Sequence, residues 1–239
     1  SATMTHNILE VCADGLDAVV EAIAGGARRV ELCRELAVDG LTPDESTINS
    51  ALTVAEKAGR EFKVMVLIRP RPGNFVYSPE EKSAMSCRIE KACRLGVHGV
   101  VIGSLNTDGT IDTEWTKAMT ELAHSHGLQV TFHRAFDHVP DFEAALETLI
   151  SIGVDRVLTS GGAPTALAGA DILSKLVAQA AGRIIIMPGA GIKSENIACI
   201  RHKTSATEFH GSCRRGDTDG FMHTDRREVN TIVKILSHP

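Results

Sequence analysis

Short apolar runs alternate with segments of helical period along almost the whole chain. Each run is rich in β-branched residues, as buried strands are, and the segments between them repeat apolar residues at helical spacing. Strict alternation implies parallel strands joined by right-handed crossovers, and eight such units close into a (β/α)₈ barrel, the TIM barrel. The eight predicted strands are Ile8–Cys12, Arg29–Cys33, Lys63–Arg69, Gly99–Gly103, Gln129–His133, Arg156–Ser160, Arg183–Met187 and Thr207–His210.

Helix boundary signals support this pattern. Ser78 before Pro79 resembles an N-cap with proline at the first helical position, and Gly26, Gly96 and Gly153 each begin a similar link from helix to strand. A doubly wound open sheet also alternates strand and helix, but it would normally carry a glycine fingerprint after the first strand, and residues 11–15 (VCADG) do not form one.

The domain organisation follows from length and from the lack of a linker. The 239 residues suit one barrel of about 250 residues, so we expect a flexible segment over 1–7 and a single TIM-barrel domain over 8–239. Residues 211–225, rich in Gly, Asp and Arg, are predicted to form a lid or rim loop.

Charge and hydropathy narrow the possible partners. A net charge of -5 without a long basic run argues against nucleic-acid and membrane partners, and no apolar stretch reaches the roughly 18 residues that span a bilayer. The polar start SATMTHN lacks the features of a signal peptide, so we expect a cytoplasmic protein with its six dispersed cysteines as free thiols.

Ionisable residues recur at the predicted strand ends, where barrels of this kind carry their sites. Side chains alternate along a strand, so Glu10 shares a face with Cys12, and Glu31 shares one with Cys33. Buried carboxylates need partners, and the other strand ends supply Arg69, His133, Glu208 and His210. This set indicates either a polar functional site or satisfied ion pairs at the solvated end of the barrel.

The cysteines allow two interpretations. Cys12 and Cys33 occupy matching places on adjacent strands, and closely spaced thiolates suit Cu(I). The alternative is that both are small buried hydrophobes, which is the usual role of a free cysteine. Cys213 lies within conceivable reach of the pair, whereas core packing is expected for the helical residues Cys87, Cys93 and Cys199.

Two glycine-containing loops follow the sixth and seventh strands, where backbone N–H groups commonly bind phosphate in this fold. Glycines also simply permit tight turns. With the nearby arginines, the expected anion-binding set is Arg69, Arg134, Ser160, Gly161, Gly189 and Gly191.

The chain resembles the CutC family, described as copper homeostasis proteins. The resemblance rests on residues 9–12 (LEVC), 29–33 (RVELC), 40–43 (GLTP), 68–78 (IRPRPGNFVYS), 131–137 (TFHRAFD), 156–161 (RVLTSG) and 187–191 (MPGAG). It implies a barrel fold, a cytoplasmic location, self-association as a dimer or larger homo-oligomer, and Cu(I) binding by Cys12 and Cys33. The chain departs from the family pattern at Asp39 and at Arg34–Glu35, which make the rim more charged.

Two functional hypotheses follow. The first is a cytoplasmic copper-homeostasis protein that binds Cu(I) near the C-terminal mouth of the barrel. The second is a TIM-barrel enzyme acting on a small phosphorylated or carboxylated metabolite, with acid-base chemistry by His133, Glu208, Glu10 and Glu31. A third possibility is a subunit of an assembly whose chemistry has been lost.

Overall fold

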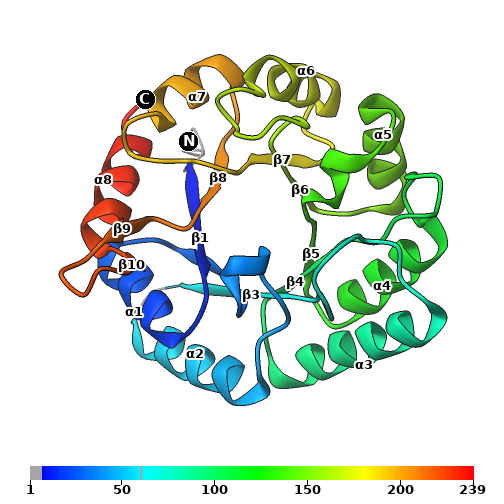
Figure 1. Ribbon diagram of the computed structural model, residues 1–239, viewed down its shortest axis with the longest axis horizontal. Helices are drawn as coiled ribbons and strands as arrows, with labels where there is room; N and C mark the ends of the chain where they lie inside the picture. Colours follow the sequence, from blue (N-terminus) through cyan, green and yellow to red (C-terminus); the bar gives the residue numbers. More distant parts are fainter. Residues whose placement is uncertain (1–6, 60) are drawn as a thin grey trace, which may run out of the picture.

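A computed structural model describes residues 7–59 and 61–239. Within them, eight strands and eight helices alternate around a ring, with the helices outside and the strands inside (Figure 1). This confirms the expected (β/α)₈ barrel. The predicted flexible segment 1–7 lies, apart from Asn7, outside the described residues.

The elements follow the predicted order, and their bounds are as follows. The barrel strands are β1 Ile8–Ala13, β2 Arg29–Leu32, β3 Lys63–Leu67, β4 Gly99–Ile102, β5 Gln129–Phe132, β6 Arg156–Thr159, β7 Ile185–Pro188 and β8 Glu208–Gly211. The helices are α1 Leu16–Gly25, α2 Glu45–Lys57, α3 Pro79–Leu95, α4 Thr113–Ser125, α5 Phe142–Ile152, α6 Ala170–Ala180, α7 Ile197–Thr204 and α8 Arg226–Leu236. Two 3₁₀ turns, η1 Leu36–Val38 and η2 Arg134–His138, follow β2 and β5.

The local signals act as expected. Ser78 and Glu81 form a capping box at the start of α3, since the Ser78 hydroxyl accepts from the Glu81 N–H and the Glu81 carboxylate accepts from the Ser78 N–H. Gly96 ends α3 with φ 87° and Gly153 ends α5 with φ 93°, a left-handed conformation that glycine adopts without strain.

All paired barrel strands run parallel. The ladders connect them in the order β7-β6-β5-β4-β3-β2-β1-β8. Strand β1 therefore has a ladder on each side, with Glu10 opposite Arg29 on β2 and opposite His210 on β8. Among the described residues, no ladder joins β7 to β8, although the two strands are neighbours in the ring (Figure 1).

The apolar residues form two separate clusters. The large one fills the layer between the strands and the helices, as in any barrel of this class. The small one consists of Cys33, Met65, Leu67 and Val101, with Cys12 and Leu36 packed against it, on the strand faces that point inward. The barrel interior is thus apolar near β3 and β4, whereas β2 also carries the charged residues Arg29 and Glu31.

Two sequence-based expectations need correction. Strands β2 to β6 end one or two residues earlier than predicted, so Cys33, Arg69, His133 and Ser160 lie in the loops that follow. Residues 211–225 do not form an irregular loop, because an antiparallel hairpin of β9 (Arg214–Gly216) and β10 (Met222–Thr224) occupies most of the segment.

Within residues 7–59 and 61–239, no helix combines the length and the apolar character that crossing a membrane requires.

Candidate functional site

A buried network of charges crosses the barrel interior. Arg29 donates from Nε to Glu10 at 2.7 Å and also pairs with Glu208, while Arg156 donates from Nε to the same Glu208 carboxylate at 2.7 Å. The other Arg156 nitrogens donate to Thr131 and Gln129, both at 3.2 Å. A charge removed from water needs such partners, so the network replaces an apolar layer of the barrel.

This placement revises the expected role of Glu208. Its carboxylate lies between two guanidinium groups and does not line the cavity at the strand ends. A carboxylate held in that way contributes to the structure of the barrel, and the geometry does not support Glu208 as an acid-base group. Arg29 and Arg156 were not predicted as part of this network, although each is a charged residue at the start of a fully buried strand.

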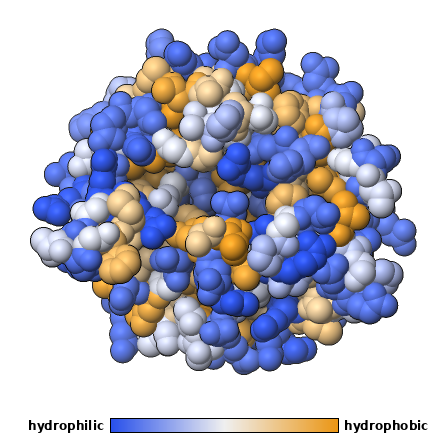
Figure 2. Space-filling view, in the orientation of Figure 1, coloured by the Kyte–Doolittle hydropathy of each residue, from blue (hydrophilic) through white to orange (hydrophobic). Residues whose placement is uncertain are grey.

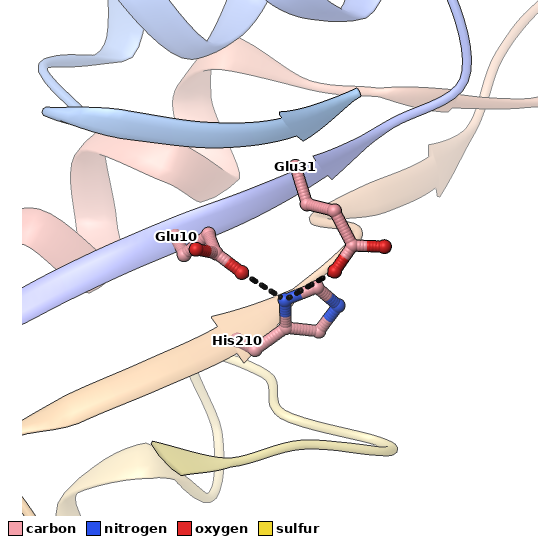
Figure 3. A group of neighbouring side chains, drawn as sticks. All are labelled: Glu10, Glu31 and His210. Carbon is pink, nitrogen blue, oxygen red and sulfur yellow. Dashed lines mark hydrogen bonds and ion pairs between the residues drawn. The ribbon is translucent and has the colours of Figure 1, made fainter. Parts of the chain in front are cut away.

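Above this network, two carboxylates meet one imidazole. Nδ1 of His210 lies 2.8 Å from an oxygen of Glu10 and 3.9 Å from an oxygen of Glu31, so β1, β2 and β8 converge on one point (Figure 3). One potential metal-ligand atom from each residue lies within 4.8 Å of the others. Oε2 of Glu31 is buried and has no hydrogen-bond partner in the part of the chain that the structure describes.

The environment gives these three groups different pKa values. Burial would raise the pKa of Glu10, but Arg29 and the hydrogen bond with His210 outweigh it and hold that pKa at about 2. Burial raises the pKa of Glu31 to about 7, with His210 opposing and Glu10 adding to the rise. Burial acts to lower the pKa of His210, yet hydrogen bonds with Cys12 and Glu10 and the charge of Glu31 raise it well above the usual value.

Cys12 and Cys33 adjoin this cluster. Hydrogen bonding with the Cys33 thiol and burial raise the pKa of Cys12 well above its ordinary value, while its hydrogen bond with His210 works in the opposite direction. Cys33 is buried, and Cys12 is half-buried at the surface of a cavity. The structure therefore brings the two predicted cysteines together and adds the His210 imidazole to them.

Cys213 lies close to the same group. It is buried after β8, with φ 53°, and lines the same cavity as Cys12. Burial raises the pKa of its thiol to about 12, and the charges of Glu228 and Cys12 add to the shift.

A cavity of about 500 Å³, here called the mouth pocket, opens at the carboxyl ends of the strands. Its walls include Cys12, Glu31, Arg69, His133, His210 and Lys193. Viewed down the barrel, the surface is hollowed near its centre and bordered by hydrophilic and hydrophobic residues (Figure 2). This volume is in the range that holds a small molecule.

His133 lines the mouth pocket in a form that does not suit a general base. Its Nδ1 accepts a hydrogen bond from the Ala135 N–H at 3.1 Å, so the neutral ring carries its proton on Nε2. Burial first, and then the charge of Arg69, lower the pKa of His133 to about 3. The ring is therefore neutral near pH 7, and the structure supports a hydrogen-bond donor where proton transfer was expected.

The loop after β6 donates hydrogen bonds to a carboxylate of the protein itself, that of Asp137. The Asp137 carboxylate accepts from the Thr159 hydroxyl at 2.5 Å, the Ser160 N–H at 3.2 Å and the Gly162 N–H at 3.1 Å. Arg134 donates to the same carboxylate at 2.8 Å. The Ser160 donors and two of the Arg134 nitrogens, Nε and Nη2, are thus already used within the protein, and the Gly161 N–H donates to the Thr159 hydroxyl.

Replacing Asp137 by asparagine is expected to lower the free energy of unfolding by about 2–3 kcal/mol, because an amide is uncharged and turns an N–H₂ group toward donors. Amide hydrogen exchange should quicken at Ser160 and Gly162, and urea unfolding measures the loss of stability.

A matched control is Asp141→Asn on the neighbouring element. Asp141 caps α5 by accepting from the Ala144 N–H at 3.1 Å, and asparagine caps a helix about as well as aspartate. Equal stability losses in the two variants would contradict a special role for Asp137.

The loop after β7 is only partly available to a ligand. The Gly189 N–H donates to the Thr159 carbonyl at 3.1 Å, so this N–H is used in hydrogen bonding next to the sheet. Ala190 and Gly191 have φ values of 79° and 72° and line the mouth pocket together with Lys193. The structure therefore leaves Gly191, but not Gly189, as a candidate for contact with a ligand.

Comparisons with known proteins agree with one another. The family model described as the CutC family matches residues 7–215. A family protein CutC of Vibrio cholerae is 48% identical over 206 residues, covering 86% of this chain and 79% of that protein. One from Sinorhizobium medicae is 43% identical over 236 residues, covering 95% and 93%. A crystal structure of the proposed copper homeostasis protein CutC from Streptococcus agalactiae has a TM-score of 0.80 at 33% identity, covering 86% of this chain and 98% of that one.

Proposed function

Because the chain belongs to the CutC family, we propose that it serves copper homeostasis by binding Cu(I) at the mouth of the barrel, with Cys12 and Cys33 as ligands. The observation that carries this proposal is the proximity of the two thiols and the His210 imidazole, with Cys12 and His210 in the wall of the mouth pocket. Thiolates and imidazoles are soft or borderline donors, and Cu(I) prefers such donors to carboxylates.

The arrangement of charges also suits a monovalent soft ion. Cys12 is a protonated thiol in the metal-free protein, since its pKa is raised, and binding of the ion replaces that proton. The Glu10 carboxylate is already engaged, because it pairs with Arg29 and hydrogen-bonds to His210. Among the described residues Oε2 of Glu31 has no hydrogen-bond partner, and with a pKa of about 7 this carboxylate is partly ionised next to the site at neutral pH.

The enzyme alternative has less support. It required acid-base chemistry from His133 and Glu208, but His133 is held as a neutral donor and Glu208 is paired with two arginines. Of the four groups expected to move protons, these two do not suit the task, which weakens the enzyme alternative.

The test is a titration of the reduced protein with Cu(I) in competition with a chromogenic Cu(I) chelator, followed by X-ray absorption at the copper edge. We expect one ion per chain and a first shell with two sulfur neighbours. Binding of no ion under competition, or a shell of oxygen and nitrogen only, would reject the proposal.

The cytoplasmic location and the self-association that the family resemblance implies remain predictions. Cell fractionation tests the first, and the solution mass of the protein tests the second.

A further inference from the structure

Two buried hydrogen-bond donors at the barrel mouth have no acceptor. Among the described residues, Nε of Arg69 and Nε2 of His133 lack hydrogen-bond partners, and each residue is only 6% exposed. Both side chains line the mouth pocket. A buried donor left without an acceptor costs about 1–3 kcal/mol, so two of them on residues that line one cavity indicate a place where an acceptor binds.

The His133 ring is fixed with its free N–H as a donor. Its other nitrogen accepts from the Ala135 N–H at the start of η2, which sets the tautomer. The ring lies against Gly103, where an added Cβ would overlap it, so the backbone of β4 leaves room for this one ring position. The donor at Nε2 is thus held in place before any ligand arrives.

The Arg69 guanidinium is held in a similar way. Its terminal nitrogens donate to three backbone carbonyls, those of Val38 at 2.5 Å, Gly40 at 3.0 Å and Gly73 at 3.1 Å. These carbonyls are uncharged, so they orient the guanidinium but do not neutralise its positive charge next to the cavity. The Phe75 ring contacts both donors, since its centroid lies 5.4 Å from Cζ of Arg69 and 5.0 Å from the His133 ring centroid.

We propose that this side of the mouth pocket binds the carboxylate of a small organic acid, which accepts from Nε of Arg69 and from Nε2 of His133. One fixed positive charge and two unused N–H donors match a monoanion with two oxygens. A phosphate group carries more charge and a third oxygen, which these two donors would leave without a partner. Phe75, Leu67 and Leu158 offer apolar contacts to a short carbon chain.

The carboxylate site is separate from the proposed copper ligands. Arg69 follows β3 and His133 follows β5, whereas the cysteines and His210 belong to β1, β2 and β8. Cys12 and His210 line the same cavity as Arg69 and His133, so a bound acid would lie beside the metal site. The inference therefore does not depend on copper binding.

The test uses metal-free, ¹⁵N-labelled protein titrated with sodium butyrate at constant ionic strength, with NMR detection of the Arg69 Nε–H and of the His133 ring. Butyramide, which has the same shape and no charge, is the matched control ligand, and sodium phosphate and sodium chloride test other anions. We expect saturable shifts of both signals with butyrate and none with butyramide.

The variant His133→Asn removes the Nε2 donor and keeps an acceptor for the Ala135 N–H, because asparagine is a good N-cap. It should weaken butyrate binding about tenfold or more, the effect of losing a hydrogen bond to a charged group. Arg69→Lys should have an effect at least as large. His202→Asn, at an exposed position of α7, should leave binding unchanged.

Three results would overturn the proposal. These are the absence of saturable shifts at millimolar butyrate, phosphate binding more tightly than butyrate, and unchanged binding by His133→Asn. Repeating the titration with the Cys12→Ser/Cys33→Ser variant separates the two ideas, because butyrate binding should persist there even though the copper ligands are gone.

Discussion

Replacing Cys12 and Cys33 together by serine is expected to weaken Cu(I) binding more than about a hundredfold. Substituting a residue that only hydrogen-bonds to a metal ligand lowers metal affinity about 10–100-fold, and here the proposed ligands themselves are removed. Serine keeps the size of the side chain and removes the soft sulfur donor. Competition titration against a Cu(I) chelator at fixed pH measures the change.

The chain supplies its own control for this experiment. Cys87 and Cys199 are exposed free cysteines on α3 and α7, and neither lines the mouth pocket. The variant Cys87→Ser/Cys199→Ser removes the same number of thiols and should bind Cu(I) as the parent does. If this variant lost binding and the Cys12/Cys33 variant kept it, copper would be bound by the exposed cysteines and the proposed site would be wrong.

Removing the Glu208 carboxylate is expected to lower the free energy of unfolding by about 3–5 kcal/mol, which is the usual cost of leaving a buried charge without its partner. In Glu208→Ala, Arg29 retains Glu10, but Arg156 retains only the neutral oxygens of Thr131 and Gln129. Arg156 is 2% exposed, so water cannot replace the lost charge. Urea unfolding measures the effect.

Two further variants show whether the cause is the unpaired charge. The double variant Arg156→Met/Glu208→Leu removes both charges and should recover most of the stability, since apolar residues often replace a buried ion pair at little cost. Glu147→Ala breaks an exposed pair with Arg183 and should cost less than about 1 kcal/mol. A loss below 1 kcal/mol for Glu208→Ala would show that the network is dispensable.

Much of the barrel could be predicted because its signals are local. Alternation along a strand places Glu10 and Cys12 on one face and Glu31 and Cys33 on another, and each strand carries that information alone. Helix ends such as Gly96 and Gly153 are equally local, since the left-handed turn needs only the one residue. Strand order then follows from the handedness of the crossovers.

The partners of the charged groups could not be predicted in the same way. Arg156 meets Glu208 across 52 residues of chain, and the pairing depends on the shear of the closed barrel. The loop after β6 looked like a ligand site because its glycines and hydroxyl groups were visible in the sequence, whereas the Asp137 that fills it comes from another loop. The role of His133 was set by one backbone N–H, that of Ala135.

Strands β7 and β8, which no ladder joins among the described residues, lie on one side of the entrance to the mouth pocket. The proposed copper ligands lie on or just after β8, β1 and β2, which neighbouring ladders hold together, with Glu10 opposite His210 and Cys12 opposite Glu31. The loop after β7, with Gly191 and Lys193, covers the same cavity from across the gap. The donors proposed for the metal thus lie on strands that ladders join, whereas the loop that borders the cavity on the other side follows a strand with no ladder to β8 among the described residues.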